Sequence, residues 1–251
     1  MEWRHDDGVR WLESELPGAR VAFTTRVGGV SPEPYDSLNL AILTGDERDR
    51  VRDNRHRLAA ALGLDPAEVL IGRQVHGADV AVHDAAPAPS AFAHPGPDLP
   101  EVDGQATSRP GLAPLVMVAD CLPIALAGPG RVAMLHCGWR GLAAGIVERG
   151  AAAVDATAAA IGPGIGPCCY EVGDEVLAAF EDLGEGVSEG RMLDLREVAR
   201  RLLEREGVGS VEASGLCTRC NAELFYSHRR DGPRTGRQAG LAWIEDTRKS
   251  E

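Results

Sequence analysis

Three residues of this 251-residue chain could together bind a metal ion, although they lie far apart in the sequence. They are His76 in the segment QVHG, Cys121 in VADC and His136 in HCGWRG. Two imidazoles and one thiolate suit zinc, and three protein ligands leave the fourth tetrahedral position open for water, as in catalytic sites. Bound zinc lowers the pKa of that water toward ~7. Copper binds the same ligand types with higher affinity, so the ligands alone do not select the metal.

The segments around Cys121 and His136 predict a hairpin that would bring these two residues together. The apolar run LVMVA is followed by PIALA, the turn residues GPG, and RVAML, which ends just before His136. A four-residue loop over 127–130, or a two-residue loop at 128–129, places Cys121 directly opposite His136, with Cβ atoms roughly 5 Å apart. A three-residue loop would instead put them on opposite faces of the sheet. Ordinary buried cysteine and histidine residues are the alternative interpretation of this pattern.

The remaining elements are predicted from hydrophobic periodicity, capping signals and turn residues. His76 falls in a turn between two short strands, EVLIGRQ and ADVAVH, and a glycine follows it. The other predicted elements are a strand over 20–26, a long loop over 28–40, a helix from Asp46 to Leu62, a helix over 140–156, a glycine-rich loop over 161–170, a helix over 173–184, a helix capped by Asp194 and Glu197 and ended by Gly207, and the strands NAELFYSH and QAGLAWIE. Residues 85–100 are rich in proline and alanine and predict a mobile loop. No repeat or composition break divides the chain, so residues 1–251 predict one α+β domain of mixed β-sheets layered with helices.

Composition and charge restrict the class of partner. The net charge of -12 argues against nucleic acid and anionic membranes, which attract basic surfaces. Nearly all the positive charge is arginine, which suits bidentate binding of small anions, although a GC-rich genome would produce the same bias. The N-terminal segment lacks the apolar core of a signal peptide, and no apolar run approaches the ~18 residues of a membrane helix. We therefore expect a cytoplasmic protein with a small-molecule partner, either monomeric or homodimeric.

Nine sequence blocks resemble, in order, those of the YfiH-like, laccase-domain family. The blocks are TTRVGGVS, LNL, QVHG, DGQAT, VADCLP, HCGWRG, IGPGIGPCCYEVG, LCTRC and SHRRDGPRTGR. The resemblance implies a fold similar to that of cytotoxic-necrotizing-factor-like cysteine hydrolases, and it implies metal ligation by His76, Cys121 and His136. Cys137 stands where most relatives have alanine, and its side chain is expected on the opposite face of the strand. Members of this family have been described as polyphenol oxidases, as purine nucleoside phosphorylases that also deaminate adenosine, and as cell-wall precursor editing factors.

The function predicted from this resemblance is a zinc-dependent purine nucleoside phosphorylase that acts on inosine, adenosine and methylthioadenosine and also deaminates adenosine. Deamination requires a carboxylate beside the metal to move protons, and the candidates are Asp120 and Asp103, each of which could instead cap a turn. Phosphorolysis requires arginines that hold phosphate. The candidates in or next to the family blocks are Arg140 as a catalytic arginine, and Arg26, Asn39, Arg73, Arg230 and Arg237 as substrate- or phosphate-binding residues.

Two alternative functions use the same residues differently. A peptidoglycan-precursor amidase would use Cys121 as nucleophile and His136 as base, a role that competes with metal binding because a zinc-bound thiolate is a poor nucleophile. A copper-dependent polyphenol oxidase of the laccase type needs many more histidines than the seven present.

A second group of cysteines lies outside these schemes. Cys217 and Cys220 form a CxxC pair that could join Cys168 and Cys169 in a structural zinc site. Because adjacent cysteines rarely bind one ion well, buried thiols are the expectation for these four residues.

Overall fold

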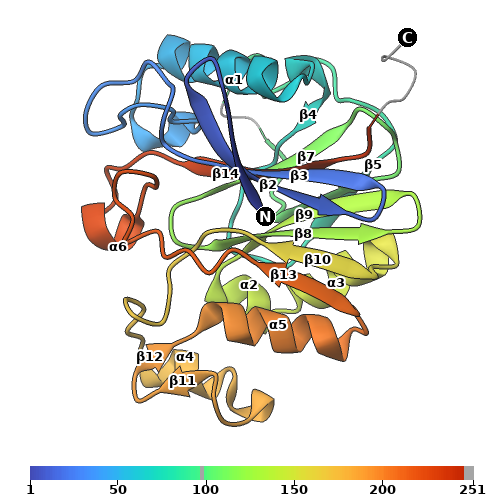
Figure 1. Cartoon of the computed structure of the whole chain (residues 1–251), viewed down its shortest axis with the longest axis vertical. Helices are drawn as coiled ribbons and strands as arrows, with labels where there is room; N and C mark the ends of the chain where they lie inside the picture. Colours follow the sequence, from blue (N-terminus) through green and yellow to red (C-terminus); the bar gives the residue numbers. More distant parts are fainter. Residues whose placement is uncertain (97–98, 246–251) are drawn as a thin grey trace.

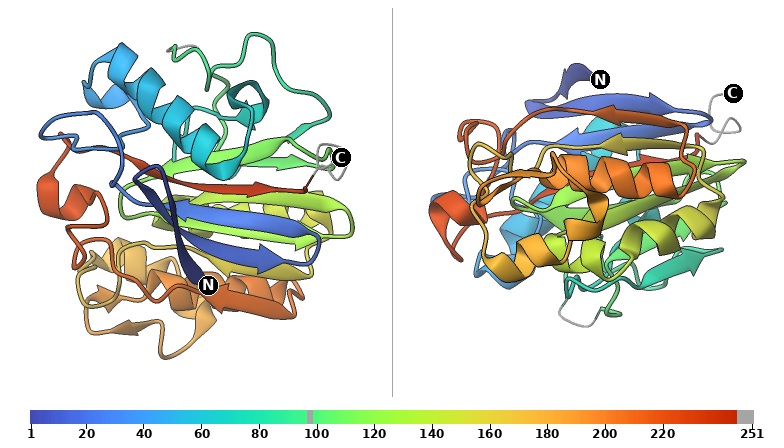
Figure 2. Two further views of the ribbon diagram at one scale, coloured as in Figure 1. Left: turned by 45° about the horizontal axis from the view of Figure 1, so that its top comes forward. Right: turned by 90° about the horizontal axis from the view of Figure 1, so that it is seen from below.

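Within residues 1–96 and 99–245, which the structure describes, two six-stranded sheets pack face to face and carry helices on their outer faces (Figure 1). This four-layer arrangement is seen in a computed structural model of the chain, and Figure 2 shows the same layers from two further directions. The strand order is β1-β2-β3-β14-β7-β4 in the first sheet and β13-β10-β8-β9-β6-β5 in the second. Most neighbours are antiparallel, but β4–β7, β5–β6 and β10–β13 are parallel. The prediction of an α+β fold with mixed sheets is confirmed.

The elements have the following bounds. The first sheet contains β1 (Glu2–Asp6), β2 (Val9–Leu16), β3 (Ala19–Thr24), β14 (Gln238–Trp243), β7 (Ala113–Val118) and β4 (Val69–Leu70). The second contains β13 (Ser210–Ala213), β10 (Ala158–Ile161), β8 (Leu122–Gly128), β9 (Arg131–Cys137), β6 (Gly104–Thr107) and β5 (Val80–His83), and β11 (Ser188–Glu189) pairs separately with β12 (Met192–Leu193). The helices are α1 (Arg48–Leu62), α2 (Trp139–Ala143), α3 (Ile146–Val154), α4 (Asp174–Ala178), α5 (Leu195–Arg205) and α6 (His228–Asp231), with short 3-10 turns at Ile42–Thr44, Pro66–Glu68 and Glu181–Leu183.

Apolar clusters join the four layers. Phe23 of β3 and Met134 of β9 lie in the cluster between the two sheets, and both are fully buried. Leu58 of α1 packs with Leu115 of β7 on the outer face of the first sheet. On the outer face of the second sheet, α2, α3 and α5 bury residues such as Ile146 against β8 and β9 (Figure 1). Burying one large apolar side chain stabilises a fold by about 1.5–3 kcal/mol, so these interfaces fix the strands that carry the site.

The β8–β9 hairpin forms as predicted, but its register differs by two residues. Its loop contains the two residues Pro129 and Gly130, so His136 pairs with Pro123 and not with Cys121. Gly130 takes the turn position because its φ of 67° is unfavourable for other residues. Gly128 stays in the strand, where a Cβ would meet the carbonyl oxygen of Val154 at 1.8 Å. A shift of two residues preserves the face on which each side chain lies, so the predicted proximity survives the wrong pairing.

Several predicted boundaries are wrong for identifiable reasons. The helix expected over 140–156 is divided into α2 and α3 at Gly145, whose φ is 88°. Glu47, and not Asp46, occupies the N-cap position of helix α1 and makes no side-chain capping bond, while the Asp46 carboxylate accepts hydrogen bonds from Ser31 and Asn39 in the long first loop. The segment NAELFYSH forms turns and the start of α6, not a strand. Its backbone N–H at Tyr226 instead donates to the side chain of Gln238.

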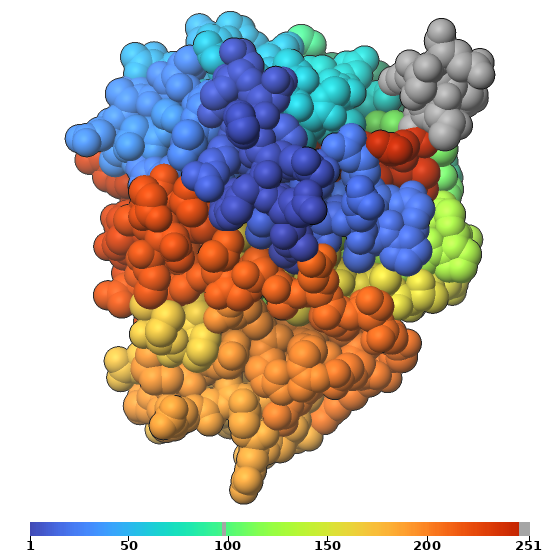
Figure 3. Space-filling view, in the orientation of Figure 1, coloured from blue at the N-terminus to red at the C-terminus, as the bar shows by residue number. Residues whose placement is uncertain are grey.

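The N-terminal strands β1 and β2 were not predicted, because charged residues interrupt their alternation, and they cross the middle of one face of the molecule (Figure 3). Strand β10 was not predicted either, because its sequence is mostly alanine. Asp194 caps α5 as predicted by accepting hydrogen bonds from two backbone N–H groups, but Glu197 pairs with arginines of its own helix and does not complete a capping box.

The loop predicted over 85–100 contains no helix or strand in its described part, and residues 97 and 98 lie outside the described residues. The middle of this loop, at residues 91 and 92, is hydrogen-bonded to α1. Phe92 is fully buried, and the Arg55 guanidinium donates to the carbonyl oxygens of Ala91 and Phe92. Among the described residues, no helix is both long and apolar enough to cross a membrane.

Candidate metal centre and its cavity

Loops and strand ends of both sheets bring His76, Cys121 and His136 together. His76 lies in the loop between β4 and β5, Cys121 follows β7, and His136 lies in β9. One potential ligand atom from each residue lies within 4.8 Å of the others. The two imidazole rings meet edge to face, with centroids 4.9 Å apart and planes at 70°. Such a cluster can be spanned by a single ion with bonds of about 2.0–2.3 Å after small side-chain adjustments.

Asp103 positions two of the three ligands. This residue precedes β6 and is 1% exposed. Its Oδ1 accepts a hydrogen bond from Nδ1 of His136 at 2.7 Å and from the backbone N–H of His76 at 2.9 Å. Its Oδ2 accepts from the backbone N–H groups of Val75 and Gly77. A carboxylate on Nδ1 leaves Nε2 of His136 to coordinate a metal, which is a common support for metal-bound histidine.

Electrostatics favour an ionised thiol at Cys121. Burial opposes ionisation, but the adjacent His136 and His76 outweigh it and lower the pKa of Cys121 to about 6. For His136, burial opposes protonation, and the Cys121 thiolate and Asp103 carboxylate together raise the imidazole pKa to about 9. The metal-free centre is therefore a thiolate–imidazolium pair near neutral pH. The thiolate is the form of cysteine that binds metals.

The backbone next to the cluster is shaped to leave room for it. A Cβ on Gly138 would lie 3.0 Å from Sγ of Cys121 and 3.1 Å from Cδ2 of His76. His76 itself has a φ of 61°, a conformation few non-glycine residues adopt. The Cys137 side chain lies among the apolar residues under α3, away from the cluster, and burial raises its pKa. The two histidines and Cys121, with their orienting carboxylate, therefore fit a zinc ion on ligand type and accessibility.

The cluster opens into a cavity of about 650 Å³. Its walls contain polar, aromatic and apolar residues from both sheets. Five arginines line it, together with His228: Arg55, Arg73, Arg140, Arg229 and Arg237. A cavity of this size accommodates a nucleoside-sized molecule.

Arg140 and Arg237 both keep guanidinium donors available to a ligand. The Arg140 guanidinium stacks on Trp139 and makes no hydrogen bond or ion pair with any described residue. Arg237 uses only one terminal nitrogen, NH1, to bond the carbonyls of Thr235 and Gly236, and burial lowers its pKa. Arg73 is about half exposed and pairs with Glu101 at 3.4 Å.

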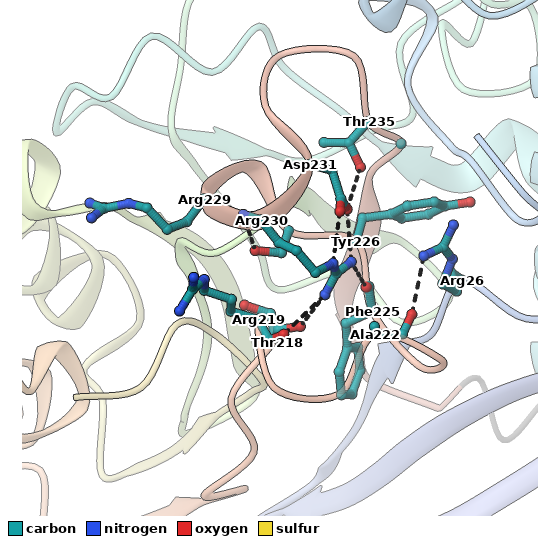
Figure 4. A network of polar contacts seen from close by, with 12 residues as sticks. Arg26, Thr218, Arg219, Ala222, Phe225, Tyr226, Arg229, Arg230, Asp231 and Thr235 are labelled. Atoms are coloured by element: carbon teal, nitrogen blue, oxygen red, sulfur yellow. Dashed lines mark hydrogen bonds and ion pairs between the residues drawn. The ribbon is translucent and has the colours of Figure 1, made fainter. Parts of the chain in front are cut away.

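Three predicted binding residues do not line this cavity. Arg230 donates to the carbonyls of Thr218, Arg219 and Phe225 and pairs with Asp231, which fixes the loop before β14 (Figure 4). Arg26 stacks on Tyr226 and pairs with Asp36. The fully buried Asn39 accepts a hydrogen bond from the backbone N–H of Arg237 and donates to Asp46. Sequence could not distinguish these structural roles from ligand binding, because both use the same residue types in loops.

Asp120 lies at the cavity but has both carboxylate oxygens occupied. Oδ1 accepts from the Thr218 hydroxyl at 2.6 Å, and Oδ2 accepts from the backbone N–H of Arg229 at 2.6 Å. Its φ of 92° is strained for a residue with a side chain. These bonds hold the segment before Cys121 in position.

Several cavity residues were missed from sequence although they lie in the family blocks. Tyr170 follows the adjacent cysteines, and His228 and Arg229 lie in SHRRDG. Gln74, the first residue of QVHG, uses its side-chain amide to bond both the N–H and the carbonyl of Met117, so it acts as an added strand partner for β7. The order of the blocks gave no indication of which side chains would converge.

The layered α+β fold and a histidine–cysteine–histidine cluster that could hold a metal ion characterise this chain. Residues 20–245 match the family described as multi-copper polyphenol oxidoreductase laccase, and the chain belongs to this family, as its motifs predict. It is 41% identical to a purine nucleoside phosphorylase of Streptomyces coelicolor, covering 91% of this chain and 96% of that protein. It is 37% identical to the purine nucleoside phosphorylase YfiH of Escherichia coli, covering 90% and 94% of the two chains. The crystal structure of YlmD from Geobacillus stearothermophilus superposes with a TM-score of 0.88 at 33% identity, over 97% of this chain and 99% of that one.

Proposed function

We propose that this chain is a zinc-dependent purine nucleoside phosphorylase that also deaminates adenosine. The observation that carries the proposal is the convergence of the histidine–cysteine–histidine cluster and five arginines on one nucleoside-sized cavity. The names of the relatives support the phosphorylase class. Inosine, adenosine and methylthioadenosine are the proposed substrates, and a cytoplasmic location follows from substrates of this kind.

Phosphate binding is assigned to Arg140 and Arg237. Both line the cavity with guanidinium nitrogens that no described residue occupies, and planar guanidinium groups bind phosphate oxygens in pairs. Arg73 and Arg229 add positive charge at the same wall. In phosphorolysis, a phosphate oxygen forms the new bond to C1′ of the ribose as the bond from C1′ to the purine nitrogen breaks. The arginines hold the attacking phosphate in place for this step and so reduce its entropic cost.

A zinc ion held by His76, Cys121 and His136 would supply a Lewis acid and a water molecule of lowered pKa. Asp103 keeps Nε2 of His136 aimed at this position. His228 and Tyr170 line the same cavity and are proposed to contact the purine base or the ribose. Asp120 remains the proposed proton-transfer carboxylate for deamination, because it is the acidic residue of the cavity wall.

The proposal is tested by matched variants of the zinc-loaded protein. Cys121→Ala should abolish release of hypoxanthine from inosine and of ammonia from adenosine. Cys137→Ala, whose sulfur is buried on the other face of the strand, should keep both activities. Arg140→Gln should raise the KM for phosphate more than the KM for inosine, and Arg149→Gln, on the exposed side of α3, should change neither. Activity that survives Cys121→Ala would refute the assigned centre.

One observation favours a second candidate, an amidase acting on a cell-wall precursor. Cys121, His136 and Asp103 have the order of a nucleophile, a base and an orienting carboxylate, with the histidine–aspartate bond at 2.7 Å. Thiol alkylation and chelation distinguish the two functions. The activity of a cysteine amidase would survive metal removal and would be lost after alkylation of Cys121. The activity of the proposed phosphorylase would be lost after metal removal.

A further inference from the structure

Four cysteines from two distant segments meet at the surface near the cavity. Cys168 and Cys169 belong to the loop after β10, and Cys217 and Cys220 to the turn after β13. Their four Sγ atoms lie within 4.8 Å of one another, with contacts of 3.6 Å from Cys168 to Cys220 and 3.4 Å from Cys169 to Cys220. We propose that these four thiols form a second metal site that binds one zinc-type ion and fastens the two loops together.

The sulfur spacing fits a tetrahedral ion with four thiolate ligands. Zinc–sulfur bonds of about 2.3 Å place the corners of such a tetrahedron about 3.8 Å apart, close to the spacing of this cluster. The four cysteines carry no disulfide in the structure. The expectation that they are buried thiols is wrong for Cys168 and Cys220, which are exposed, so apolar packing does not account for the cluster. Exposure of two sulfurs also gives an ion a path of entry.

Backbone hydrogen bonds hold the most buried member of the group in place. Cys217 is 6% exposed, and its Sγ accepts a hydrogen bond from the backbone N–H of Gly166 at 3.2 Å. Cys217 also bridges to Gly164 in a parallel arrangement, and the Asn221 side chain donates to the Cys217 carbonyl oxygen. The CxxC turn and the cysteine-pair loop are therefore joined by main-chain bonds before any metal binds. Such preorganisation lowers the entropic cost of binding.

Positive charge lies next to the cluster. Four thiolates around Zn²⁺ carry a net charge of minus two, and the thiol protons are released as the ion binds. Arg219, between the two cysteines of the CxxC pair, lies beside Cys169. The Arg196 guanidinium lies so close to Gly166 that a Cβ there would meet it at 2.9 Å. These two arginines offset the charge of a four-thiolate site.

The position of the cluster gives it a structural effect on the cavity. Tyr170, which lines the cavity, directly follows Cys169, and Thr218, which donates to Asp120, directly follows Cys217. An ion that links these loops would fix both the position of Tyr170 in the cavity wall and the hydrogen bond from Thr218 to Asp120. The second site would therefore stabilise the cavity wall by linking its two loops. This structural role does not depend on which reaction takes place in the cavity.

Metal stoichiometry of purified protein, reconstituted with Zn²⁺ under reducing conditions and then desalted, tests this proposal. Wild-type protein should bind two ions per chain. Cys168→Ser combined with Cys220→Ser should bind one, and these exposed positions should tolerate serine. His76→Ala combined with Cys121→Ala should also bind one, and Cys137→Ala should keep two. If the variant with His76→Ala and Cys121→Ala bound no zinc, the proposal would be overturned.

A second measurement covers the case in which a variant folds poorly. Wild-type protein loaded with Co²⁺ should show thiolate-to-cobalt charge-transfer absorption with the intensity of five thiolates, four from this cluster and one from Cys121. The serine variant should retain the intensity of one. An intensity of one thiolate in the wild-type protein would contradict a four-cysteine site, whatever the activity on nucleosides.

Discussion

Replacing Asp103 by asparagine should weaken zinc binding at His76, Cys121 and His136 by about 10–100-fold. The carboxylate accepts four hydrogen bonds, two on each oxygen. The asparagine amide has one oxygen, so its NH₂ group must face two of these four donors. If it faces the backbone N–H groups of Val75 and Gly77, both of those bonds are lost. If the NH₂ faces His136, the ring proton must move to Nε2, the nitrogen that should bind the metal.

The same substitution should also destabilise the metal-free protein. A hydrogen bond to a charged group contributes about 1.5–3 kcal/mol, so the loss of one or two such bonds at a site that is 1% exposed should cost about 1.5–6 kcal/mol of unfolding free energy. Zinc affinity is measured by competition with a chelating dye, and stability by urea denaturation in the presence of excess chelator. Asp79→Asn, an exposed residue near the same loop, is the matched control and should change neither. Wild-type zinc affinity in the Asp103→Asn variant would refute the positioning role.

Three further predictions follow from the geometry and charges. Gly138→Ala should weaken zinc binding about tenfold, because the added Cβ would crowd Cys121 and His76, whereas Gly209→Ala, in open space, should have no effect in the same chelator competition. Zinc affinity should fall as pH drops below about 9, because His136 must lose a ring proton to bind the ion, and it should fall more steeply below about 6, where protons also compete for the Cys121 thiolate; equal affinity at about pH 5 and about pH 8 would contradict this. On α5, hydrogen bonds from arginines lower the pKa of Glu197 to about 2, so its contribution is present above its ordinary pKa of 4.5 and is lost as pH falls toward 2. Glu197→Gln should therefore cost about 1 kcal/mol of stability near pH 7 and nothing near pH 2, as urea denaturation at the two pH values would show.

The sequence predicted that Cys121 and His136 lie close together, and the structure shows this proximity despite an error in the predicted pairing. The hairpin register was wrong by two residues because the loop begins at Pro129 and not before it. Since side chains alternate with a period of two, that error left Cys121 and His136 on compatible faces. An error of one residue would have separated them.

The roles of polar loop residues could not be predicted in the same way. Arg230 and Arg140 are both arginines in family blocks, yet one fixes a loop through backbone carbonyls and the other faces the cavity. Asp103 was expected at a turn or in proton transfer, and it combines a turn-holding role with support of His136. These differences depend on tertiary contacts between segments far apart in the chain. Hydrophobic periodicity carries no information about them.

The most direct test of the proposed function is the release of hypoxanthine and ribose 1-phosphate from inosine by zinc-loaded protein, measured with and without phosphate. The proposed function predicts that both products form in equal amounts, that formation requires phosphate, and that removal of zinc abolishes it. Zinc-loaded protein that forms neither product, or that forms hypoxanthine equally well without phosphate, would contradict a phosphorylase.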